Sequence, residues 1–247
     1  MTDPKKANVL ILPYKFKGLK DGSLTRFLEL SEKYNIPLLA FYIDDDESSY
    51  DLPKNLHLAQ GMSNHFNLGL DYKNLQNEIF FSNKEIEAFK KKINLPNDFA
   101  LIQSSAKSVY TKNKEWNFDG MQKIIDHFDK FNWMQIGKNN EPKLKNCTHL
   151  LNLNLRELSY VISKSRFLVV YEGLFNHIAS CFNKKTFVIH LGFLHEVSFK
   201  YPNNIIINQN ENLKCYPCYL LDCKNHKNFS KNFMSDEFVI NALEKNM

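Results

Sequence analysis

Short apolar runs alternate with segments of helical spacing through the chain after Leu95-Pro96. The apolar runs predict strands over Phe99–Gln103, Trp133–Ile136, Phe167–Val170, Thr186–His190 and Ile205–Ile207. The amphipathic segments predict helices over Phe118–Phe131, Leu155–Ser165, Leu174–Phe182 and Phe233–Leu243. Strands that alternate with helices favour a parallel sheet covered by helices on both faces. We therefore expect an α/β, Rossmann-like fold, in which ligands bind at the loops that follow the strands.

The first part of the chain shows a weaker form of the same pattern. Strands are expected over Val9–Leu12 and Leu38–Ile43, with a helix over Leu24–Tyr34 between them. The stretch from Ser48 to Asn77 has no clear periodicity, and we interpret it as loops with short elements. This part of the chain is therefore expected to form a shortened α/β lobe.

A helix start is encoded at Ser82, because Glu85 follows it at the spacing of a capping box. This helix is expected to run to about Ile93, and Leu95-Pro96 then marks a boundary. We expect a shortened N-terminal lobe on the acceptor side, a Rossmann-like nucleotide-sugar-binding domain and a C-terminal helix, over residues 1–95, 96–232 and 233–247.

The composition is that of a globular protein with a mild positive charge. Hydrophobic residues make up 43% of the 247 residues, which is enough for a sizeable core. The net charge of +5 is too small to imply a nucleic-acid-binding protein by itself, because basic residues are interleaved with acidic ones. Such a balance suits anionic ligands such as nucleotide diphosphates, or a weak association with an acidic membrane surface.

The distribution of apolar residues gives an expectation about location. No stretch approaches the roughly 18–20 apolar residues that a membrane-spanning helix needs. The polar segment Met1–Lys6 precedes only the short run Val9–Leu12, which is typical of a strand and not of a signal peptide. We expect a cytoplasmic protein, with peripheral association to the inner membrane as an alternative.

Four residues near the C-terminus have a spacing that could bind a metal ion. Cys215, Cys218, Cys223 and His226 follow the pattern C-x2-C-x4-C-x2-H, which could hold zinc tetrahedrally. The chain has five cysteines, and an odd number without an export signal argues against a disulfide framework. The alternatives to zinc are small apolar thiols or a local redox pair.

The loop Gln103–Trp116 follows an expected strand and precedes an expected helix. Ser104, Ser105 and Lys114 offer hydroxyl and ammonium groups there. Such groups at the N-terminus of a helix suit a phosphate. The alternative is a solvated, lysine-rich loop.

A second loop, Tyr171–His177, occupies the corresponding place after another strand. Gly173 would let the backbone approach a ligand closely. Glu172 could accept hydrogen bonds from ribose hydroxyls or from loop N–H groups, and His177 could donate to a phosphate or sugar oxygen. Alternatively, Glu172 is a charge favoured by the helix dipole and His177 is a packed core histidine.

Together these loops resemble the C-terminal half of glycosyltransferase family 9, the ADP-heptose:lipopolysaccharide heptosyltransferases and their relatives. Lys114-Glu-Trp116 matches a Lys-x-Trp-like element of the family, which follows a strand-end loop with Ser or Thr. The segment Ser165–Ala179 is similar to a second family motif, with Glu172 at its acidic position and His177 at the same spacing. One glycine of the usual pair, Gly173, is present.

The resemblance covers about Asn77–Cys223 and implies the two-domain GT-B fold without a cofactor. Many family members have a similar cysteine pattern near Cys215–Cys223, whose role the resemblance leaves open. The residues that it implies for donor binding are Ser104, Ser105, Lys114, Glu172, Gly173 and His177.

The resemblance also implies a catalytic base. Family members often have a Gly-Asp pair after the first strand, and here Asp21 lies near that place with a different spacing. A base is needed because an inverting transfer deprotonates the acceptor hydroxyl as it attacks the anomeric carbon. Lys114 could stabilise the leaving diphosphate. The alternative for Asp21 is a turn residue.

The leading hypothesis is therefore a glycosyltransferase. It would transfer a heptose or related sugar from a nucleotide diphosphate donor to a bacterial surface glycan or glycolipid, such as lipooligosaccharide or capsule. The alternative is a catalytically degenerate homologue that binds nucleotide or glycan and supports a partner transferase. Two further alternatives are another GT-B-like enzyme, such as an epimerase or hydrolase, and a zinc-dependent nucleic-acid module, for which no aromatic and basic stripe is present.

Overall fold

The chain divides into two compact units, Met1–Pro53 and Lys54–Met247. The computed structural model describes residues 10–14, 33, 38–42, 57, 60, 61, 64, 69, 77–106, 113–218, 220, 223, 225 and 234–247. The domain boundary near residue 95 stays a prediction.

The first unit contains two parallel strands among its described residues. β1 (Leu10–Tyr14) pairs with β2 (Leu38–Tyr42), from Leu10 opposite Leu38 to Tyr14 opposite Tyr42. Both expected strands are thus confirmed. The expected helix over Leu24–Tyr34 lies outside the described residues, apart from Lys33, which is helical.

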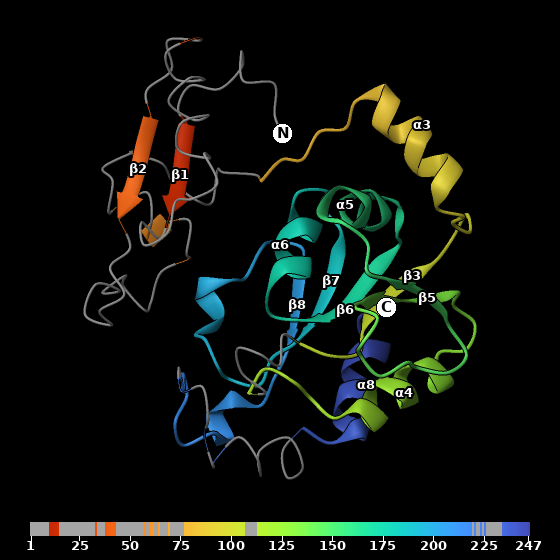
Figure 1. Cartoon of the computed structure of the whole chain (residues 1–247). Helices are drawn as coiled ribbons and strands as arrows, with labels where there is room; N and C mark the ends of the chain where they lie inside the picture. The colour runs from red at the N-terminus through yellow and green to blue at the C-terminus, as the bar shows by residue number, and fades with distance from the viewer. Residues whose placement is uncertain are drawn as a thin grey trace. The chain divides into compact units, whose positions relative to one another are not determined.

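The second unit is built on a six-stranded, all-parallel sheet (Figure 1). The strand order is β5-β4-β3-β6-β7-β8, so the chain winds outward from β3 in one direction and then from β6 in the other. This order confirms the expected α/β, Rossmann-like fold. The strands are β3 (Ala100–Gln103), β4 (Trp133–Gly137), β5 (Thr148–Leu151), β6 (Phe167–Tyr171), β7 (Lys185–Ile189) and β8 (Asn204–Ile207).

Helices cover both faces of this sheet (Figure 1). α4 and α8 pack on one face, and α5 and α6 pack on the other, with α3 beside α5. The helices are α3 (Asn83–Lys92), α4 (Phe118–His127), α5 (Leu155–Lys164), α6 (Leu174–Ser180) and α8 (Asp236–Glu244), with short 3-10 turns η4 (Glu196–Ser198) and η5 (Asn210–Asn212).

Strand β6 shows why the central strands are apolar without interruption. Phe167, Val169 and Tyr171 belong to the core beneath α4 and α8, whereas Leu168 and Val170 belong to the core beneath α5 and α6. Successive side chains of a strand point to opposite faces, and both faces are covered here. All five residues are therefore buried.

Capping residues explain where the helices begin. Ser82 and Glu85 form the expected capping box of α3, and Asn154 caps α5 in the same way with Glu157. Ser235 caps α8 by accepting a hydrogen bond from the Phe238 N–H, so this helix begins at Asp236.

Two expectations were wrong in detail. α4 ends at His127 and not at Phe131, because the backbone of Phe128 leaves the helical conformation and places its ring in the core. β5 was not expected, since Thr148 and His149 are exposed and polar at the edge of the sheet. In the described part of the chain, no helix is long and apolar enough to cross a membrane.

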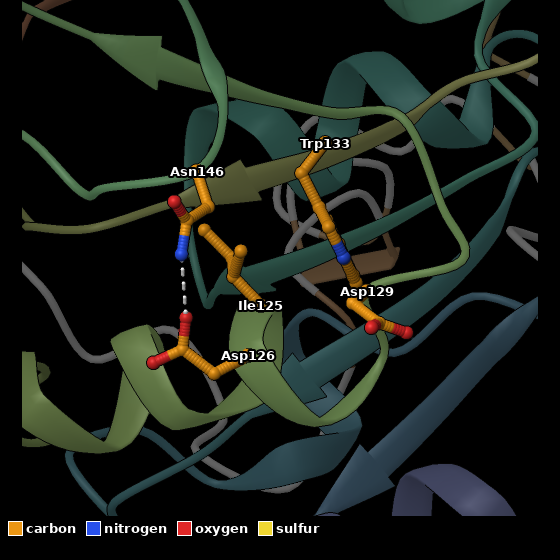
Figure 2. Close-up of a pocket in the computed structure, with 5 residues that line it drawn as sticks. All are labelled: Ile125, Asp126, Asp129, Trp133 and Asn146. Atoms are coloured by element: carbon orange, nitrogen blue, oxygen red, sulfur yellow. Dashed lines mark hydrogen bonds between the residues drawn. The ribbon is translucent and has the colours of Figure 1, made fainter.

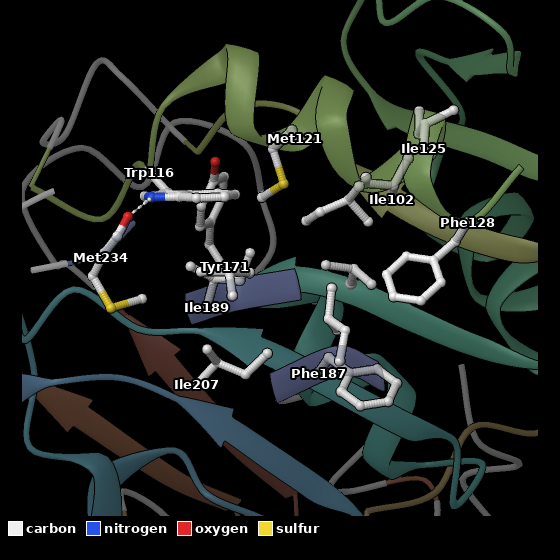
Figure 3. Packing of buried hydrophobic residues seen from close by; sticks show 14 of the residues in the cluster. Ile102, Trp116, Met121, Ile125, Phe128, Tyr171, Phe187, Ile189, Ile207 and Met234 are labelled. Carbon is white, nitrogen blue, oxygen red and sulfur yellow. Dashed lines mark hydrogen bonds between the residues drawn. The ribbon is translucent and has the colours of Figure 1, made fainter. Parts of the chain in front are cut away.

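Trp116 joins the loop after β3 to the segment just before α8 (Figure 3). Its ring is buried, and its Nε1–H donates to the carbonyl oxygen of Met234 over 2.7 Å. The ring lies against Gly120 in α4, where an added Cβ would come within 2.6 Å of Trp116 Cζ3. Only glycine therefore leaves room for this contact.

We expect Gly120→Ala to destabilise the protein although alanine favours helix by about 1 kcal/mol. Displacing the buried Trp116 ring should lower the free energy of unfolding by roughly 1–3 kcal/mol. Urea unfolding followed by circular dichroism measures this change. Lys84→Ala, on the exposed surface of α3, is the matched control. A stability equal to or above that of the wild type would contradict the packing role of Gly120.

Candidate functional site

The candidate site lies where the winding of the sheet reverses, at the carboxyl ends of β3 and β6. In open parallel sheets, ligands bind in the crevice outside such strand ends. The loop after β3 carries Lys114, and the turn after β6 carries Glu172 and Gly173. The two expected ligand loops therefore meet at the carboxyl-terminal ends of the two central strands.

Glu172 lies at the centre of a buried polar group. Its Oε1 is 3.1 Å from Lys114 Nζ, and its Oε2 is 2.9 Å from His190 Nε2. The side chain of Glu172 is 2% exposed and that of His190 is fully buried, whereas Lys114 is 18% exposed. Only the lysine of these three therefore reaches towards solvent.

The charge state of Glu172 follows from this environment. Burial raises the pKa of its carboxyl, but the hydrogen bond from His190 and the positive charge of Lys114 outweigh burial. The pKa of Glu172 therefore lies below its usual range, and the group is a carboxylate at neutral pH. Both of its oxygens lie beside side chains of the protein, and the expected role of Glu172 as an acceptor for ribose hydroxyls or loop N–H groups stays a prediction.

His177 on α6 is held by hydrogen bonds on one side of its ring. Its Nδ1 is 2.7 Å from the hydroxyl oxygen of Tyr201, and Asn77 Nδ2 donates to the same oxygen over 3.0 Å. Burial, followed by the charge of Lys114, lowers the pKa of His177, so that the ring is neutral at pH 7.

A second buried histidine packs beside Tyr201. The rings of His57 and Tyr201 meet edge to face, with 5.0 Å between their centroids. Burial, with a smaller contribution from the charge of His177, lowers the pKa of His57 to about 4. Two neutral imidazoles thus lie against Tyr201, and neither adds positive charge to that of Lys114 at neutral pH.

Gly173 begins α6 with a φ of 145°, a conformation that residues with side chains rarely adopt. An added Cβ there would meet no atom of the described residues within 4 Å, so these residues leave the space above the turn open, as a ligand-facing loop requires.

The expected serines take different positions. Ser104 is buried, donates from its hydroxyl to the carbonyl oxygen of Pro142 over 3.1 Å, and accepts from Gln135 Nε2 over 2.7 Å. This geometry favours a structural role for its hydroxyl. Ser105 is half-buried, and its carbonyl oxygen accepts from Gln103 Nε2.

The structure adds an acidic residue that the sequence analysis missed. Glu141 follows β4 at the same edge of the sheet, and burial raises the pKa of its carboxyl, with a smaller contribution from the charge of Glu115. An added Cβ at Gly137 would collide with the carboxylate of Glu141, so this glycine makes room for it. The sequence signal that could have indicated Glu141 is the glycine at the end of the strand, Gly137, which is followed by this acidic residue four positions later.

The cysteine cluster is confirmed as a spatial cluster. The sulfur atoms of Cys215, Cys218 and Cys223 all lie within 4.8 Å of one another, with 3.6 Å between the Sγ atoms of Cys215 and Cys223. Burial raises the pKa of the Cys218 thiol. His226, the fourth expected ligand, and Asp21, the expected base, lie outside the described residues.

A cavity of about 310 Å³ lies elsewhere, beside the start of β4 (Figure 2). Ile125, Asp126, Asp129, Trp133 and Asn146 line it, and Asn146 donates to Asp126. Trp133 is the first residue of β4, so this cavity lies at the amino-terminal ends of the strands. Lys114 and Glu172 lie at their carboxyl-terminal ends.

Comparisons with known proteins support the fold. No protein-family model and no curated protein matches the sequence. The chain is similar to the iron-containing, dodecameric heptosyltransferase TibC of enterotoxigenic Escherichia coli, solved with ADP-D-β-D-heptose. That match has a TM-score of 0.61 at 12% identity and covers 85% of this chain and 58% of TibC.

Two further solved structures have the same fold. The glycosyl transferase family 9 protein of Veillonella parvula matches with a TM-score of 0.56 at 14% identity, over 97% of this chain and 74% of that one. E. coli ADP-heptose lipopolysaccharide heptosyltransferase II matches with a TM-score of 0.52 at 12% identity, over 71% of this chain and 55% of that one. The chain thus spans 55% of heptosyltransferase II and 58% of TibC in its complex with ADP-D-β-D-heptose, and 76% of TibC in a second structure. Its fold is α/β and GT-B-like, and its solved structural neighbours include family 9 heptosyltransferases.

Proposed function

We propose that this protein is a glycosyltransferase that transfers a heptose or related sugar from a nucleotide diphosphate donor to a bacterial surface glycan. The observation that carries the proposal is the position of Lys114, at the edge where the sheet reverses its winding. A structural neighbour of the same fold was solved with ADP-D-β-D-heptose.

Lys114 has the chemistry that a diphosphate requires. Its ammonium group has three donors and forms an ion pair with Glu172, with 3.1 Å between Lys114 Nζ and Glu172 Oε1. The side chain of Lys114 is 18% exposed, so a ligand can approach its ammonium group. A cation at this place would stabilise the negative charge that develops on the leaving diphosphate. Glu172 would hold the lysine in position.

Neighbouring groups complete the proposed donor site. His177 is neutral and can donate a hydrogen bond to a phosphate or sugar oxygen. The open turn at Gly173 would let the ligand approach the backbone. The Glu141 carboxyl, at the end of β4, could accept hydrogen bonds from ribose hydroxyls.

We expect Lys114→Ala to weaken binding of the nucleotide sugar by about 10- to 100-fold, because a hydrogen bond to a charged group contributes about 1.5–3 kcal/mol. Glu172→Gln should weaken binding in the same direction, since the lysine loses its anchor. Calorimetry with ADP-, GDP- and UDP-sugars measures both effects, and Lys91→Ala on the exposed surface of α3 is the control. No binding of any of these donors to the wild type would remove the proposed function.

Catalysis requires a base in addition to the donor site. We propose that the Asp21 carboxylate takes the proton of the acceptor hydroxyl while the acceptor oxygen bonds to the anomeric carbon. The bond between that carbon and the diphosphate oxygen breaks at the same time, and the diphosphate leaves with the electron pair.

Asp21→Asn should lower turnover at least about 100-fold and leave donor binding unchanged, because it removes only the base. A steady-state assay with a truncated glycan acceptor, beside donor calorimetry, separates the two effects. Turnover equal to that of the wild type would exclude Asp21 as the base. Donor binding by a wild type that never turns over would favour the alternative, a degenerate homologue that supports a partner transferase.

We also propose that the cysteine cluster binds one metal ion. A tetrahedral ion with metal–sulfur bonds of about 2.3 Å holds its sulfur ligands about 3.8 Å apart. The sulfur distances of Cys215, Cys218 and Cys223 fit such an ion after small movements. Thiolates suit zinc or iron, and His226 is the proposed fourth ligand. A bound ion there would fix the loop, as closed structural sites do.

Protein purified without chelators and under reducing conditions should contain about one zinc or iron ion per chain. Cys218→Ser should lose the ion and lower the melting temperature, because it removes one of the thiolate ligands. Elemental analysis with thermal unfolding checks both results. Cys181→Ser, which alters a cysteine outside the cluster, is the control. A wild type without stoichiometric metal would contradict this proposal.

A further inference from the structure

We infer that His190 is a positioning residue, which holds Lys114 in place for the donor diphosphate by fixing the Glu172 carboxylate between them. This inference rests on the proposed function. It assigns a role to a residue whose own side chain is fully buried, and therefore touches no ligand directly.

The sheet itself brings His190 to Glu172. Tyr171, the last residue of β6, pairs with Ile189, the last residue of β7. Glu172 and His190 are the next residues along each strand, so their side chains emerge together at the same edge. The 2.9 Å contact between His190 Nε2 and Glu172 Oε2 follows from this register.

The other side of the imidazole is equally constrained. Asn210 is buried in η5, and its Nδ2 lies 2.9 Å from His190 Nδ1. When this amide donates to Nδ1, the ring proton is on Nε2, the atom that lies 2.9 Å from Glu172 Oε2. Phe199 packs edge to face against the ring at 4.8 Å, and Tyr216 lies beyond it at 6.1 Å.

Charge and burial explain why Glu172 needs a second partner. A carboxylate with almost no exposure is costly unless its oxygens are hydrogen-bonded and its charge is paired. Lys114 Nζ lies beside Oε1 of Glu172, and the flexible stem of the lysine loses side-chain entropy when the ammonium is held there. Without His190, burial would favour the neutral acid, and the lysine would lose its anchor. Among the residues that the structure describes, His177 interacts with the charge of Glu172, and Tyr216 faces the His190 ring.

The competing explanation is that His190 only fills space in the core. That explanation predicts that an apolar residue of similar volume would serve equally well. The inference predicts instead that the N–H donor matters. His190→Leu removes the donor, whereas His190→Gln keeps an amide N–H that can reach Glu172.

The test compares these two variants by calorimetry with ADP, GDP and UDP, using the one that the wild type binds best. His190→Leu should bind that nucleoside diphosphate at least about 10-fold more weakly, and His190→Gln should stay within about threefold of the wild type. Binding of the matching nucleoside, followed by NMR titration, should be unchanged in both variants, because it does not use Lys114. Equal losses for nucleoside and diphosphate would overturn the inference.

A double-mutant cycle tests whether His190 acts through Glu172. His190→Leu should cause no further loss of diphosphate binding in a Glu172→Gln background, since the carboxylate that it fixes is absent. Losses that add would overturn the inference. His127→Leu, an exposed histidine on α4, is the matched control.

Two measurements keep the inference testable if His190→Leu fails to fold. His190→Phe retains a ring of similar volume without the donor and should show the same loss for the diphosphate. In the wild type, the imidazole ¹⁵N spectrum should show the proton of His190 on Nε2, and a proton on Nδ1 alone would overturn the inference. If the wild type binds no nucleoside diphosphate, both the proposed function and this inference are wrong. If the wild type binds one and neither His190→Leu nor His190→Phe weakens that binding, only this inference is wrong.

Discussion

The pairing of β6 with β7 inside a sheet covered on both faces is the constraint on which the candidate site depends. Tyr171 and Ile189 are locked opposite each other by that pairing and by the packing of their side chains in the core. A shift of one residue would send every side chain of the strand to the other face. The register is therefore strongly fixed, and it also fixes the distance between Glu172 and His190, the residues that follow Tyr171 and Ile189.

Much of the fold was predictable because it follows from local patterns. Uninterrupted apolar runs mark the buried strands, and Ser82 with Glu85 marks a helix start. β5 was missed because it is an edge strand whose first two residues are exposed and polar. Its sequence therefore shows neither an apolar run nor an alternation of apolar and polar residues. The end of α4 was misplaced because Phe128 is apolar and in the core, although its backbone is no longer helical.

The candidate site was predictable in part only. Lys114 and Glu172 were found from the loops that carry them, and the structure brings the two together. Their pairing with His190 was not found, because it depends on strand register and on Asn210, which comes 20 residues later. Ser104 illustrates the reverse: a hydroxyl at a strand end is typical of a ligand loop, but this one bonds to the backbone of Pro142. Local sequence cannot distinguish a hydroxyl that bonds to the protein interior from one that faces a ligand.

Gly192, two residues after His190, links the end of β7 to the segments around it. It has a φ of 80°, and a Cβ there would lie 2.6 Å from Leu213 Cδ2 and 3.0 Å from Asn210 Oδ1. Any larger residue would push away the amide that holds the imidazole, and Gly192 also accepts a backbone hydrogen bond from Cys218. The orientation of the His190 ring therefore depends on the absence of a side chain at Gly192, two residues later.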